Sequence, residues 1–211
     1  MWFAAGVTRD LEIVAFESAE AFEAWLGENH AVSPGIWLKL RKKRPGIVAL
    51  DYSQALDAAL CHGWIDGRKA KLDDQWWLQR FTPRTPRSKW SKVNREKAAA
   101  LIAQGRMRPP GQAEVDRAKA DGRWEAAYDG ARTATVPEDL IAALTADPAA
   151  AEFFERLDRQ NRYAILYRIQ DAKRAETRAR RIEKYVAMLA RGEKPHRGIS
   201  AQVSPRKGDS H

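Results

Sequence analysis

The sequence has very little cysteine: its 211 residues include one, Cys61. A single cysteine excludes an intramolecular disulfide and leaves no cysteine pair with the spacing of a zinc site. The four histidines are scattered along the chain without ligand spacing, so we expect no bound metal. A lone thiol is typical of proteins in a reducing compartment, which predicts a cytoplasmic location.

Long hydrophobic runs are also missing. The longest apolar stretches, residues 47–50 and 98–103, fall well short of the roughly 20 residues that a membrane helix needs, so no membrane span is expected. The first residues lack a cluster of positive charge followed by a continuous apolar core, so we expect no signal peptide. Both absences favour the cytoplasm.

Familiar catalytic motifs are absent as well. The chain has neither a glycine-rich phosphate loop nor a serine in a nucleophile elbow, so no cofactor and no enzyme of those classes is expected. Cys61 and His62 suggest a nucleophile and its base, but neighbours on a helix point about 100° apart. We therefore predict a buried thiol, a histidine that interacts with helix-terminal carbonyls, and no catalytic residue.

Positive charge is what the chain has in excess. Its net charge is +9, although residues 1–40 are predominantly acidic. Residues 78–110 carry nine Lys or Arg side chains against one carboxylate, that of Glu96. This balance favours an anionic partner, whose identity the sequence does not give. Nucleic acid bound without sequence specificity is one candidate.

Hydrophobic periodicity separates two halves of different type. The first half alternates like a set of strands at residues 11–16, 36–40, 47–50, 64–72 and 76–81. Helical spacing occurs between or after them, at residues 19–28, 51–62 and 88–104. These segments predict an α+β fold with a mainly antiparallel sheet and packed helices.

The second half is predicted to be helical. Its helical segments are residues 112–120, 137–144, 149–169 and 172–189. The domain organisation we expect is an α+β domain at 1–130, a helical region at 131–192 and a disordered basic tail at 193–211.

Cations, hydroxyls and an indole cluster between Phe81 and Lys92, where a helix is predicted to begin. Free N–H groups at a helix start, flanked by arginine and serine, suit a phosphate or a carboxylate. The candidate residues for binding an anion or another ligand are Trp64, Asp66, Arg84, Arg87, Ser88, Lys89, Trp90, Ser91 and Asn94. A structural role also fits, in which Arg84 pairs with Asp66, Ser88 caps the helix and Trp90 fills the core.

The last predicted helix is amphipathic. Apolar residues recur every three or four positions from Ala172 to Leu189 and predict a packed stripe. The opposite side is a candidate basic face, formed by Lys173, Arg174, Arg178 and Arg181.

Several motifs in this order resemble one family. They are Cys61–Gly67, Arg80–Arg84, Ser88–Ser91 with Asn94, Gly105–Met107 with Gly111, and Ala172–Ile182. Together they resemble the bacteriocin-protection, YdeI/OmpD-associated family over residues 10–195. The resemblance implies a YjbR/CyaY-like fold, protection from bacteriocins or cationic peptides, and association with an outer-membrane porin, and it supplies no catalytic residue. Because no export signal is expected, we do not expect contact with a porin.

Three functions remain open. The first is a non-enzymatic cytoplasmic binding protein of this family, linked to stress or antimicrobial-peptide resistance, whose basic face engages an anionic partner. The second is a nonspecific DNA- or RNA-binding protein, because no base-reading motif accompanies the charge. The third is a small-molecule enzyme or sensor with a pocket around Trp64, Asp66, Arg84 and Trp90.

Overall fold

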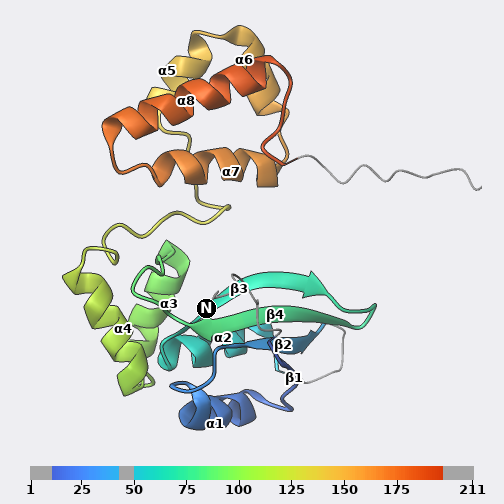
Figure 1. Cartoon of the computed structure of the whole chain (residues 1–211), viewed down its shortest axis with the longest axis vertical. Helices are drawn as coiled ribbons and strands as arrows, with labels where there is room; N and C mark the ends of the chain where they lie inside the picture. The colour runs from blue at the N-terminus through green and yellow to red at the C-terminus, as the bar shows by residue number, and fades with distance from the viewer. Residues whose placement is uncertain (1–10, 43–49, 197–211) are drawn as a thin grey trace, which may run out of the picture. The chain divides into compact units, whose positions relative to one another are not determined.

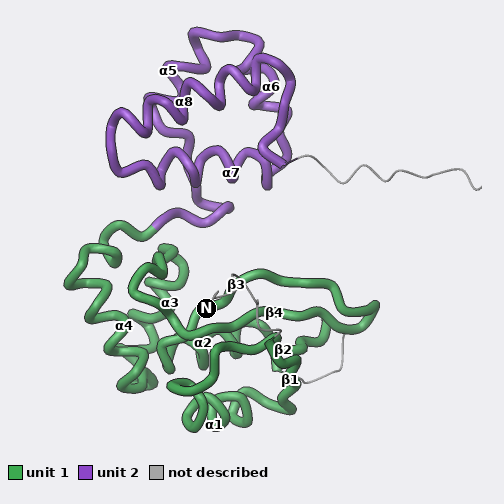
Figure 2. The backbone as a smooth tube through the Cα atoms, viewed as in Figure 1, with its two compact units in different colours: residues 1–127 green, residues 128–211 purple. Residues whose placement is uncertain are grey.

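A computed structural model describes residues 11–42 and 50–196 (Figure 1). The chain divides into two compact units, Met1–Ala127 and Tyr128–His211 (Figure 2). The strand expected at residues 47–50, except Leu50, and the tail beyond residue 196 lie outside the described residues.

The first unit contains a four-stranded sheet. Its strands are β1 (Ile13–Val14), β2 (Ile36–Arg41), β3 (Trp64–Lys71) and β4 (Trp76–Pro83). They lie in the order β1-β2-β4-β3, with β1 parallel to β2 and the other pairs antiparallel. In the β3–β4 pair the register shifts between Asp66 and Lys69. The predicted α+β class is confirmed.

Four helices accompany this sheet: α1 (Ala19–Asn29), α2 (Tyr52–Cys61), α3 (Lys92–Ala103) and α4 (Pro109–Ala120). The side chains of Ser18, Asp51 and Ser91 cap the first three by accepting backbone N–H bonds. Such caps satisfy amide groups that have no partner inside the helix. The expected α3 cap therefore falls on Ser91, not on Ser88.

The two faces of the sheet differ. Along β2, Ile36, Leu38 and Leu40 are buried, and the residues between them point to the opposite face. Helices α1 and α2 lie on the buried side (Figure 1). Phe22 of α1 packs on Phe81 of β4, with 5.9 Å between ring centroids. The sheet is therefore covered on one face by these two helices.

The second unit is helical, as predicted. It contains α5 (Glu138–Thr145), α6 (Pro148–Glu155), α7 (Arg159–Gln170) and α8 (Ala175–Ala190). The single helix expected over residues 149–169 is wrong, because the chain breaks after α6 and the Asp158 side chain caps α7. The buried side of α8 is formed by Ile182, Tyr185 and Leu189. None of the described helices is both long and apolar enough to cross a membrane.

Candidate functional site

The Asp66 side chain links β3 to two helices through hydrogen bonds. Its carboxylate accepts a hydrogen bond from the Tyr52 hydroxyl at 2.8 Å and one from the Asn94 side-chain amide at 3.3 Å. These bonds differ from the ion pair with Arg84 that the sequence suggested. Trp64, two residues earlier, is 1% exposed and its indole N–H donates to the His30 carbonyl.

Arg84 and Trp90 pack against each other inside the first unit. The guanidinium carbon of Arg84 lies 3.5 Å from the centroid of the Trp90 ring, and Nη1 donates to the Lys89 carbonyl at 3.2 Å. Trp90 also meets Trp124 edge-on, with 4.9 Å between centroids. Both Arg84 and Trp90 are buried, so this cation–π pair is part of the core.

The loop before α3 uses its hydroxyl groups locally. Ser88 Oγ accepts from the Thr85 amide, and Ser91 Oγ accepts from the Asn94 amide. Arg87 and Lys89, in contrast, are exposed. Among the candidate anion-binding residues of this loop, the structure thus shows some as buried or capping groups and two, Arg87 and Lys89, as surface cations.

A second surface brings together residues that the sequence reasoning did not group. We call it the open sheet face, and it is formed by Trp37, Lys39, Arg41, Trp76 and Arg80. It is the side of the sheet opposite α1 and α2. Trp37 and Trp76 are partly exposed and stand outside the first unit's apolar core as the structure describes it.

Cations and indoles lie next to one another on the open sheet face, around the buried Leu78. Trp37 is directly opposite Arg80, and Arg41 is opposite Trp76. Lys39 Nζ lies 4.5 Å from the Trp76 ring centroid, and the Arg41 guanidinium carbon lies 5.5 Å from it. These distances allow cation–π attraction, which holds long side chains against the rings.

Positive charge dominates the strands as a whole. The described strands carry six cations, Lys39, Arg41, Arg68, Lys69, Lys71 and Arg80. Lys69 and Lys71 are opposite Gln79 and Trp77 on the covered face. The single carboxylate of these strands is that of Asp66, which shares the covered face with Phe81. The open sheet face therefore presents positive charge without a carboxylate from the strands themselves.

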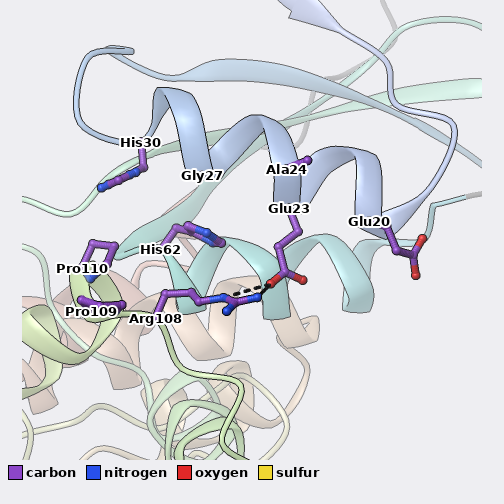
Figure 3. A pocket seen from close by; sticks show the side chains of 9 residues that line it. All are labelled: Glu20, Glu23, Ala24, Gly27, His30, His62, Arg108, Pro109 and Pro110. Carbon is purple, nitrogen blue, oxygen red and sulfur yellow. Dashed lines mark hydrogen bonds and ion pairs between the residues drawn. The ribbon is translucent and has the colours of Figure 1, made fainter.

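A cavity of about 640 Å³ opens elsewhere in the first unit (Figure 3). One wall is a side of α1 that bears Glu20, Glu23, Ala24 and Gly27. The remaining lining residues are His30, His62, Arg108, Pro109 and Pro110. Arg108 Nη2 forms an ion pair with Glu23 Oε1 at 3.0 Å, so this cation and this carboxylate bind each other across the cavity.

Two histidines occupy equivalent places in this cavity. His30 and His62 are the C-terminal caps of α1 and α2, and their ring centroids are 6.0 Å apart. Each Nδ1 lies 3.0 Å from a carbonyl four residues earlier, of Leu26 and Ala58 respectively. Because a carbonyl only accepts, each Nδ1 carries a proton, and in the neutral ring Nε2 keeps its lone pair.

Burial controls the chemistry of the Cys61–His62 pair. Desolvation lowers the pKa of His62 below its ordinary value, which favours the neutral ring. Desolvation also raises the pKa of the Cys61 thiol to about 11, so the thiolate is scarce near neutral pH. Cys61 is 1% exposed, as the prediction of a buried thiol requires. No group of three or more possible metal ligands occurs among the described residues.

The predicted basic face of the second unit is partly engaged in packing contacts. Arg178 bonds Asp139 through Nε and Nη2, at 2.5 and 2.9 Å. Arg181 donates to the Arg168 carbonyl. Lys173 and Arg174 precede α8 and are exposed. Two of the four residues thus link α8 to neighbouring segments, and two are surface cations.

Sequence reasoning missed the cavity because its histidines are 32 positions apart and share no motif. The open sheet face had a signal, since Ile36–Arg41 alternates apolar residues with tryptophan and cations. The alternation within β2 does not predict how β4 pairs with it, and this pairing is what places Trp76 and Arg80 beside these residues.

Comparison with known proteins gives a family match in each unit. Residues 14–114, which include both the open sheet face and the cavity, match a family described as a domain of unknown function (DUF8412). Residues 133–192 match the family described as bacteriocin-protection, YdeI or OmpD-associated. No curated protein and no solved structure matches the chain. The resemblance to the bacteriocin-protection, YdeI or OmpD-associated family is thus confirmed for residues 133–192, whereas the motifs quoted from the first unit lie in the segment that matches the other family.

Proposed function

We propose that the protein binds single-stranded nucleic acid through the open sheet face. The observation that carries this proposal is the combination of partly exposed Trp37 and Trp76 with Lys39, Arg41 and Arg80 on one face. Proteins that bind single strands without sequence preference combine a positive surface for the backbone with aromatic rings on which bases stack.

Charge supports an anionic partner. Lys39, Arg41 and Arg80 lie on the open sheet face, and the one carboxylate of the described strands, that of Asp66, belongs to the covered face. Contacts between such cations and phosphates release counterions, so affinity decreases as salt increases. Arg87 and Lys89, exposed in the loop after β4, extend the positive charge of the first unit.

The tryptophans favour a single strand over a duplex. An indole stacks on a base only where the base is unstacked from its neighbours, as in single-stranded segments. A duplex hides those base faces, and reading its major groove needs an inserted helix or ribbon. The open sheet face presents rings and cations on a pleated surface, and α1 and α2 lie behind it.

We further propose that the protein is cytoplasmic and acts by binding, without catalysis. A single cysteine and a basic surface suit a nucleic-acid-binding protein of the cytoplasm, and none of the contacts described above requires a chemical step. A link to bacteriocin or antimicrobial-peptide resistance is supported only by the description of the family that matches residues 133–192.

Fluorescence anisotropy with a labelled oligonucleotide of about 12 nucleotides tests the proposal. We expect Trp37→Leu and Trp76→Leu to weaken binding, each by about 1 to 3 kcal/mol if one base stacks on each ring. Phe153→Leu in the second unit is the matched control for loss of an aromatic ring, and it should leave affinity unchanged.

Charge-reversal variants distinguish binding at the open sheet face from attraction by the net charge of the whole chain. Arg80→Glu and Arg132→Glu change the net charge equally, but Arg132 lies in the second unit. We expect Arg80→Glu alone to reduce the slope of log affinity against log salt, by about 0.7 per lost phosphate contact. Equal effects of the two variants, tighter binding of a duplex, or no binding at micromolar protein in about 50 mM salt would each contradict the proposal.

A further inference from the structure

We propose that the cavity between α1 and the start of α4 binds a small cationic amine. The site goes beyond nucleic-acid binding and shares no residue with the open sheet face. Its volume of about 640 Å³ is within the range of small-molecule sites. Figure 3 shows His30, His62 and the Glu23–Arg108 pair around this space.

The first observation is a pair of hydrogen-bond acceptors. His30 and His62 both use Nδ1 on a backbone carbonyl, so each neutral ring has an Nε2 lone pair left over. Within the described part of the chain, neither Nε2 has a hydrogen-bond partner. His62 is only 6% exposed and lines the cavity. Each Nε2 lone pair can therefore accept a hydrogen bond from an N–H donor of a ligand in the cavity.

The second observation is Gly27, which lies in the last turn of α1. Glycine lowers the stability of a helix relative to alanine. No steric need explains it, because a Cβ at this position would have nothing within 4 Å and the backbone does not have a positive φ. Gly27 instead keeps the α1 wall of the cavity low, next to Ala24. The space above Gly27 is therefore open to a ligand in the cavity.

The third observation is the sign of the charge. The carboxylates of Glu20 and Glu23 line the cavity, and Arg108 is its one lining Lys or Arg and is already bound to Glu23. The C-terminal ends of α1 and α2 also meet here, at His30 and His62, and helix C-termini favour positive charge. The cavity thus attracts a cation, although the chain as a whole has a net charge of +9.

These features select the chemistry of the ligand. An ammonium group has N–H donors for the imidazole Nε2 atoms and a charge that the carboxylates attract. A neutral alcohol of the same shape has donors without the charge, and an anion is repelled by Glu20 and Glu23. The side of α1 that carries positions 20, 23, 24 and 27 gives room for an alkyl chain along the helix.

NMR of the full-length protein with ¹⁵N-labelled histidine tests this proposal at pH 7.5, with 1,4-diaminobutane as the probe. We expect the Nε2 resonances of His30 and His62 to shift with saturation, while those of His196 stay unchanged. 1,4-Butanediol is the matched neutral probe and should bind about tenfold more weakly or not at all. Equal shifts with diol and diamine would overturn the assignment of a cationic ligand.

Two variants locate the site. Gly27→Leu should place a side chain where the ligand is proposed to lie and abolish the diamine-induced shifts, and it should keep or raise the melting temperature because leucine favours a helix. Ala100→Leu, at an exposed position of α3, is the control and should bind as the unchanged protein does. Binding that survives Gly27→Leu, or histidine shifts produced by Zn²⁺ but not by the diamine, would overturn the proposal. Loss of nucleic-acid binding by Trp37→Leu would leave these shifts intact.

Discussion

At the scale of single residues, His62 shows two electrostatic effects in competition. A helix C-terminus favours a positively charged imidazole, and the bond to the Ala58 carbonyl acts in the same direction. Burial opposes both, because the charged ring loses its water. The pKa of His62 is lowered, so burial prevails and the ring stays neutral.

This shift predicts a pH dependence of folding. The unfolded ring titrates near pH 6.5, and the folded ring titrates lower, so the unfolded state binds more protons in between. Stability should therefore decrease as pH falls below about 6.5 and level off below the folded pKa. Urea unfolding at several pH values between 7.5 and 5 measures this slope. His62→Asn should flatten it, and an equal slope in both proteins would show that other groups cause it.

At the scale of elements, Asp66 connects three of them. The side chain belongs to β3, and its hydrogen-bond donors come from the first residue of α2, Tyr52, and from the first turn of α3, Asn94. Asn94 is 8% exposed, so its amide depends on this carboxylate for a partner. The two hydrogen bonds to Asp66 therefore hold the N-terminal ends of α2 and α3 next to β3.

Asp66→Ala should therefore destabilise the first unit by about 1 to 3 kcal/mol, because it leaves a buried amide without its acceptor. Asp66→Asn keeps an oxygen for Asn94 and should cost less. Thermal or urea unfolding of Asp66→Ala, Asn94→Ala and the double variant gives the coupling energy, which we expect at about 0.5 to 3 kcal/mol. Additive losses would mean that the bond between Asp66 and Asn94 contributes nothing.

The sequence predicted elements better than contacts between them. Local signals identified the helices that follow Ser18 and Asp51, the strands of the sheet and the buried stripe of the last helix. The break near Asp158 was missed because apolar residues continue on both sides of it. The cavity depends on the packing of α1 on α2, which brings His30 beside His62, and no spacing along the chain encodes that proximity.

At the scale of the whole molecule, each unit has its own core. One cluster is built around Phe22, Trp64 and Phe81, and another around Phe154, Ile165 and Leu189, without a shared member. The two family matches, at residues 14–114 and 133–192, also fall in separate units. Each unit thus has its own set of buried contacts, which is what independent folding requires.

We expect a fragment of residues 128–196 to fold without the first unit. It should begin before Asp129, whose backbone accepts from the Tyr163 hydroxyl and whose side chain accepts from Gln170. Far-UV circular dichroism should show helix and a cooperative thermal transition, although a unit of this size is marginally stable. A fragment starting at residue 133 is the control, and it should melt at lower temperature. A featureless, non-cooperative melt of the longer fragment would contradict independent folding.

The register shift in β3 has a consequence for encounters between copies of the chain. β3 is an edge strand, and an edge with unpaired backbone groups can template the addition of a strand from another molecule. Here the regular ladder is interrupted between Asp66 and Lys69, and Arg68, Lys69 and Lys71 place like charges along the edge. Two such edges repel each other, and the irregularity interrupts a continuous ladder of backbone bonds, so β3 resists edge-to-edge aggregation.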